Sequence, residues 1–146
     1  MGGWRERLQQ AYEATAYRID EGPRGRFVIR VGERSADADA LLEVAGVDEW
    51  AFVTASNPRS MLLSEADNAA RLSRLVGLVR EKGLVHYRGA GQGADATWPP
   101  EPSLLVVGLA EAEAVALARA FDQHAIVAGR RGEPARLVWT GAGGAA

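Results

Sequence analysis

Cysteine is absent from the 146-residue chain, which excludes disulfides, Cys-ligated zinc, iron–sulfur clusters and thiol nucleophiles. Histidine occurs only at His86 and His124, without the close spacing that is typical of a metal site. No apolar run approaches the roughly 20 residues that cross a membrane. The first residues also lack the apolar segment of a signal peptide. We therefore expect a cytoplasmic protein with no metal, no cofactor and no membrane partner.

An excess of positive charge is also lacking, because 17 Lys and Arg residues stand against 19 Asp and Glu residues, the formal net charge is −2, and Lys82 is the only lysine. Tight attachment to duplex nucleic acid requires several phosphate contacts from a basic surface. The sequence has no stripe of arginines with interleaved aromatic residues, so we expect no tight binding of duplex DNA. The glycines of Gly89–Gly93 precede prolines and not the helix that a phosphate-binding loop requires. The standard nucleotide-binding motifs are therefore excluded.

Hydrophobic patterning predicts the order helix, hairpin, short helix, strand, helix, two strands, helix and hairpin. The segment Trp50–Ala55 is apolar on both faces, as in a central strand, and Ser64 is expected to cap the helix that follows. A long loop is expected over Gly89–Pro102. The pattern predicts an α+β fold: a mixed, mostly antiparallel sheet with hairpins at both ends and about three to four helices packed on it. We expect one domain over residues 1–140 and a flexible tail over residues 141–146.

Polar residues stand out at the ends of the expected strands and on one helix. Asn57, Glu101 and Gln123 lie at strand junctions, where sheet proteins gather functional groups. Asn68 lies on the otherwise apolar stripe of its helix, where an unpartnered amide costs about 1–3 kcal/mol. Asn68 therefore either holds the turn at Ser56–Ser60 or faces a cleft, and the sequence leaves both interpretations open.

Five segments of the chain resemble a small bacterial family of unknown function, DUF3293. They are Ala11–Tyr17, Thr54–Ser60, Leu63–Arg71, Trp98–Val106 and Phe121–Val127, and the resemblance extends over residues 8–139. The family pattern has a Thr-Ala-x-Asn-Pro turn, an Asn and an Arg in the next helix, a Glu-x-Ser and a Phe-x-Gln. This resemblance selects as candidate site residues Thr54, Asn57, Asn68, Arg71, Glu101, Ser103 and Gln123.

Three functions fit these residues. In the first, the cluster binds a small polar or anionic ligand or a protein partner, and Arg71 is available for a carboxylate or phosphate. In the second, the protein is a small hydrolase-like enzyme in which Glu101 is the general acid or base and Asn57, Asn68 and Gln123 orient the substrate. In the third, the cluster is structural and the protein acts through its surface. A second copy of the chain is a further partner that the sequence leaves open.

Overall fold

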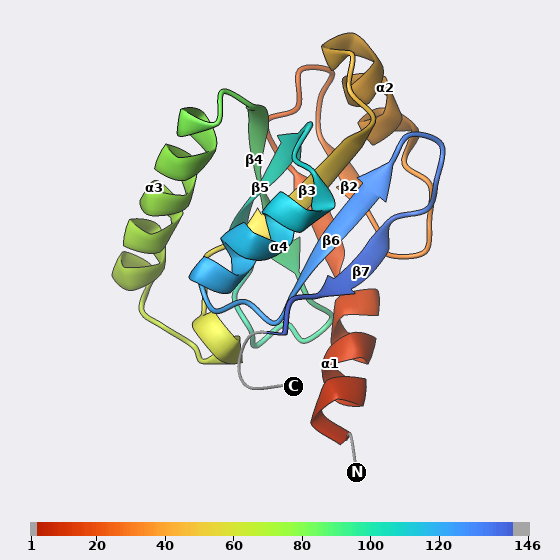
Figure 1. Cartoon of the computed structure of the whole chain (residues 1–146). Helices are drawn as coiled ribbons and strands as arrows, with labels where there is room; N and C mark the ends of the chain where they lie inside the picture. The colour runs from red at the N-terminus through yellow and green to blue at the C-terminus, as the bar shows by residue number, and fades with distance from the viewer. Residues whose placement is uncertain (1–2, 142–146) are drawn as a thin grey trace.

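The computed structural model describes residues 3–141, so the expected tail over residues 141–146 lies, except for Gly141, outside the described residues (Figure 1). The α-helices are α1 (Gly3–Glu13), α2 (Ala36–Ala45), α3 (Glu65–Glu81) and α4 (Glu111–Ala120), with a 3-10 turn, η1, at Pro58–Ser60. The strands are β1 (Ala16–Ile19), β2 (Phe27–Ile29), β3 (Glu49–Thr54), β4 (Val85–Gln92), β5 (Glu101–Val107), β6 (Ala125–Arg130) and β7 (Arg136–Trp139). In residues 3–141, no helix has the length and apolar character needed to span a membrane.

All seven strands form one sheet in the order β2-β1-β4-β5-β3-β6-β7. Every neighbouring pair is antiparallel, and hairpins of consecutive strands form both ends of the sheet. The predicted α+β fold is confirmed, including the hairpins and the helices packed on the sheet.

The sheet curls until its two edges meet at one corner. A parallel bridge joins Val31, which follows β2, to Ala135, which precedes β7. The amide of Gly32 donates to the Ala135 carbonyl at 2.8 Å, and the Ala135 amide donates to the Glu33 carbonyl at 3.0 Å. Because β2 and β7 are the outermost strands, these bonds require a strongly curved sheet.

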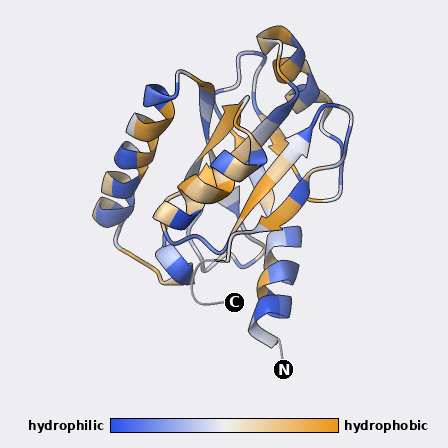
Figure 2. Ribbon diagram, in the orientation of Figure 1, coloured by the Kyte–Doolittle hydropathy of each residue, from blue (hydrophilic) through white to orange (hydrophobic). Residues whose placement is uncertain are grey.

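The two faces of the curled sheet carry separate hydrophobic cores. Helices α3 and α4 cover the outer face, where Ala51 and Val53 of β3 are buried. Helix α2 covers part of the inner face, where Trp50 and Phe52 of the same strand are buried. The prediction that β3 is buried on both faces is therefore confirmed. Figure 2 shows hydrophobic colour along the strands, whereas α1 is largely hydrophilic and has no fully buried residue.

The predicted loop over Gly89–Pro102 is wrong at both ends. Strand β4 continues to Gln92 and β5 begins at Glu101, so only residues 93–100 connect them. Gly89 explains the error, because a β-carbon there would lie 1.9 Å from the carbonyl oxygen of Arg18 on β1. Gly89, a residue type that is typical of loops, here permits the close approach of a neighbouring strand.

Candidate functional site

The chain leaves β3 through a segment with unusual backbone angles. Asn57, Arg59 and Ser60 all have left-handed conformations, with φ of 48°, 54° and 61°. Pro58 disfavours a right-handed helical conformation at the residue before it, and Asn tolerates the left-handed one. Each such residue costs on the order of 1–3 kcal/mol unless its surroundings hold it in place.

Asn57 and Asn68 hold this segment together. The Asn57 amide N–H donates to Oδ1 of Asn68, and Nδ2 of Asn68 donates to Oδ1 of Asn57, both at 2.9 Å. The amide of Leu63 donates to the same Oδ1 of Asn57 at 2.9 Å. Asn68 thus reaches back from the first turns of α3, which begins after the Ser64 cap as predicted. This geometry matches the turn-holding interpretation of Asn68.

The same network reaches a carboxylate. Nδ2 of Asn57 donates to Oε2 of Glu101 at 2.7 Å, and the indole Nε1 of Trp98 donates to that oxygen at 3.2 Å. Asn57 is 4% exposed, whereas Glu101 is only partly buried and lines the cavity described below. Asn68, Asn57 and Glu101 therefore form one connected chain of side chains that fixes the position of the carboxylate.

Arg71 and Gln123 connect the end of β3 to the end of α4. Arg71 donates from Nε to the Ala55 carbonyl at 2.5 Å and from Nη2 to the Phe121 carbonyl at 2.6 Å. Nε2 of Gln123 donates to the Ser56 carbonyl at 2.9 Å and to the Phe121 carbonyl at 3.3 Å. Two of the donors of Arg71 are thus occupied by backbone groups.

Thr54 and Ser103 make local backbone contacts. The Thr54 hydroxyl donates to the Pro102 carbonyl at 2.8 Å and accepts from the Ser56 amide at 3.0 Å. The Ser103 hydroxyl donates to the Glu101 carbonyl at 2.7 Å. The two residues are paired across β3 and β5, on the inner face of the sheet.

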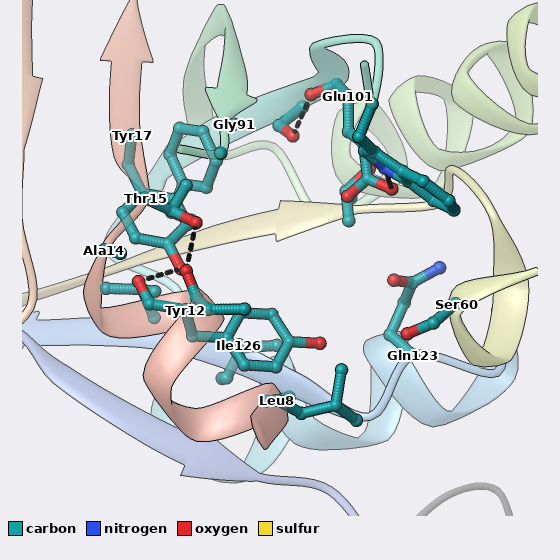
Figure 3. Close-up of a pocket in the computed structure, with 18 of the residues that line it drawn as sticks. Leu8, Tyr12, Ala14, Thr15, Tyr17, Ser60, Gly91, Glu101, Gln123 and Ile126 are labelled. Carbon is teal, nitrogen blue, oxygen red and sulfur yellow. Dashed lines mark hydrogen bonds between the residues drawn. The ribbon is translucent and has the colours of Figure 1, made fainter. Parts of the chain in front are cut away.

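A cavity of about 480 Å³ opens at the end of the inner face that α2 does not cover. Helix α1 forms one wall and contacts β7, where Tyr12 packs edge-on against Trp139 with their ring centroids 6.0 Å apart. Figure 3 shows the labelled side chains of Leu8 and Tyr12 facing Gln123 and Glu101 across the cavity. Phe52 and Val127, which belong to the inner core, extend the apolar wall inward.

Polar side chains also face this apolar space. Among them are Tyr12 of α1, Glu101 and Ser103 of β5, and Gln123, which lies just before β6. Because Nε2 of Gln123 donates to two backbone carbonyls, its amide oxygen is turned toward the cavity (Figure 3). Burial, with a smaller contribution from the negative charge of Glu101, raises the pKa of Tyr12 far above its ordinary value. Tyr12 therefore stays neutral over the physiological pH range.

Comparison with known proteins identifies the family. Residues 53–126, about half of the chain, match the model of a family described as "Protein of unknown function (DUF3293)". The chain belongs to DUF3293. No curated protein and no solved structure matches it. The DUF3293 match includes all seven candidate site residues, whereas α1 lies outside it.

The structure brings these seven residues to one end of the sheet in two layers. Four line the cavity: Thr54, Glu101, Ser103 and Gln123. The other three lie behind it and bond to the backbone or to Glu101: Asn57, Asn68 and Arg71. Within residues 3–141, no group of three His, Asp or Glu residues is placed to hold a metal ion.

The aromatic wall of this DUF3293 cavity was not predicted from the sequence. Tyr12 and Trp98 line it, although both belong to segments that carry the family resemblance. Trp98 lies three residues before Glu101, a spacing at which the two side chains meet across the turn. The position of Trp98 beside three prolines and a candidate carboxylate was the signal that could have indicated its role.

Proposed function

We propose that this DUF3293 protein binds a small organic molecule in the cavity between α1 and the inner face of the sheet. The observation that carries this proposal is an open apolar cavity of about 480 Å³ into which a few fixed polar groups converge. Ligand sites are typically clefts of about 300–1,000 Å³ with mostly apolar walls and a small number of placed polar groups. Such sites occur among other places in the mouths of β-barrels, and the curl of this sheet gives its inner face a similar open end.

The inner face of β5 supports this proposal. Its inward-facing residues alternate along the strand as Glu101, Ser103, Leu105 and Val107. The last two are buried in the inner core, whereas the first two face the cavity. A strand that served only to close a core would continue its apolar pattern. The change from apolar to polar residues coincides with the mouth of the cavity.

The polar contacts favour binding over catalysis by Glu101. The enzyme hypothesis requires Asn57, Asn68 and Gln123 to orient a substrate. The first two amides bond to each other and to backbone groups, and neither lines the cavity. Their arrangement supports positioning of the Glu101 carboxylate, which is what a recognition site requires.

Filling the cavity tests the proposal. Gly91 of β4 lines it, and a β-carbon there would lie 3.8 Å from Thr15 and 3.9 Å from the Tyr17 ring, in ordinary contact. Gly91→Leu therefore adds a side chain to the cavity without a backbone clash. Gly77→Leu on α3 is the matched control, because nothing lies within 4 Å of a β-carbon there.

The probes are phenethylamine, 2-phenylethanol and phenylacetate, which share a phenyl ring and differ in charge. Binding is followed through the indole N–H resonance of Trp98 in two-dimensional NMR spectra, assigned with Trp98→Phe. We expect at least one probe to shift this resonance in the wild type and in Gly77→Leu but not in Gly91→Leu. Ala11→Leu, on the exposed surface of α1 beside the cavity, serves as a second filling variant if Gly91→Leu does not fold. The proposal fails if no probe shifts the resonance, or if the shifts persist in the filled variants.

A further inference from the structure

The cavity has acidic residues in its lining but no basic ones. Its ionisable residues besides tyrosines are Asp95 and Glu101, and no Lys, Arg or His is among the described residues that line it. Arg71, the cation that the sequence suggested for an anionic ligand, donates two of its N–H groups to backbone carbonyls behind the cavity. An anionic ligand would therefore lose its hydration and meet like charge, which is a large cost in an apolar space.

Two of the polar groups that face the cavity offer acceptor oxygens. Oε2 of Glu101 accepts from Asn57 and Trp98, while no donor among residues 3–141 bonds to its Oε1. The amide oxygen of Gln123 faces the cavity from the opposite side (Figure 3). These groups are acceptors, so the ligand that satisfies them must donate hydrogen bonds. An ammonium group has three donors and no acceptor.

Aromatic side chains surround the same space. Tyr12, Tyr17, Phe52 and Trp98 line the cavity, and the Trp98 indole bonds directly to the carboxylate. The faces of aromatic rings attract cations, and the attraction is strongest for Trp and for desolvated sites. The neutral phenol of Tyr12 adds an aromatic surface without adding a second negative charge beside Glu101.

From this placement we infer that the cavity selects a small organic cation, an ammonium group attached to an apolar or aromatic body. The ammonium group binds the Glu101 carboxylate, and the apolar body lies against Leu8, Phe52 and Val127. Asn57 and Asn68 act as positioning residues, because they hold the carboxylate in place before the ligand arrives. This inference rests on the proposed function and specifies the charge of the ligand.

The same three probes test the charge, now by titration to compare their dissociation constants at neutral pH. We expect phenethylamine to bind more tightly than 2-phenylethanol, and phenylacetate to bind most weakly. Glu101→Gln keeps the size of the side chain and an acceptor oxygen for Asn57 and Trp98 but removes the charge. It should weaken phenethylamine binding roughly 10- to 100-fold, the range for losing a hydrogen bond to a charged group, with a much smaller effect on 2-phenylethanol.

Glu81→Gln, an exposed substitution on α3, is the matched control and should leave all three constants unchanged. Two results overturn the inference while the proposed function stands. In one, 2-phenylethanol or phenylacetate binds as tightly as phenethylamine and still loses binding in Gly91→Leu. In the other, phenethylamine keeps its affinity in Glu101→Gln. If no probe binds in the cavity of the wild-type protein, the result instead contradicts the proposed function.

Discussion

Replacing Asn68 by leucine removes two hydrogen bonds from the left-handed segment after β3. In the first, the amide N–H of Asn57 donates to Oδ1 of Asn68. Asn57 is 4% exposed, so water cannot replace the lost acceptor. An unsatisfied buried donor costs about 1–3 kcal/mol, and the bond from Nδ2 of Asn68 to Asn57 contributes about 0.5–1.5 kcal/mol more. Leucine recovers a few tenths of a kcal/mol through its helix propensity. It can also contact Leu63 across the start of α3, where a hydrophobic staple would form.

The net expectation is that Asn68→Leu lowers the free energy of unfolding by about 2 kcal/mol. For a chain of this size, that loss lowers the melting temperature by roughly 4–8 °C. Thermal and urea unfolding followed by circular dichroism measure the change. Ala70→Leu, an exposed site on the same helix, is the matched control and should stay within about 0.5 kcal/mol of the wild type. An unchanged or higher melting temperature for Asn68→Leu would refute the turn-holding role.

Three further substitutions test the fold. Gly77 is a solvent-exposed position in the middle of α3, where a β-carbon would meet nothing within 4 Å. Gly77→Ala should raise the free energy of unfolding, measured with urea, by about 0.5–1 kcal/mol, because alanine loses less backbone entropy on folding. A decrease would contradict this. Gly89→Ala should lower stability by several kcal/mol, since its β-carbon would lie 1.9 Å from the Arg18 carbonyl oxygen; near wild-type stability would show that β1 does not approach so closely. The folded-state pKa of Tyr12 is raised above the unfolded value of about 10, so its contribution is complete below that pH and is lost as pH rises further. Tyr12→Phe should therefore reduce the alkaline loss of stability, and identical pH profiles for the two proteins would contradict the burial of this phenol.

Features set by local sequence were predicted well. The Ser64 cap and the apolar stripe at Leu75 and Val79 define α3, because capping and helical periodicity depend on residues within a few positions. The burial of β3 on both faces follows in the same way from its unbroken apolar run. Gly89 was misinterpreted because its role depends on Arg18, which is distant in the sequence.

The sequence indicated a group of polar residues at the strand junctions, but not how the fold arranges them. Residue type indicated that Arg71 could bind an anion, but only the folded structure places its N–H groups on the carbonyls of Ala55 and Phe121. The cavity itself depends on the curl of the sheet and on the position of α1, and both result from pairing across the whole chain. Tyr12 therefore could not be assigned to a site from its neighbours in the sequence.

The bridge between Val31 and Ala135 has a consequence for how the molecule unfolds. It joins positions about a hundred residues apart, so the β1–β2 and β6–β7 hairpins support each other directly. Neither hairpin can detach at that corner without exposing backbone groups of the other, which favours loss of both in a single cooperative step. At the opposite end, α1 contributes no fully buried residue and can separate at a smaller cost. Hydrogen exchange should therefore be slow around Gly32 and Ala135 and fast along α1, so that this wall of the cavity can open while the sheet remains folded.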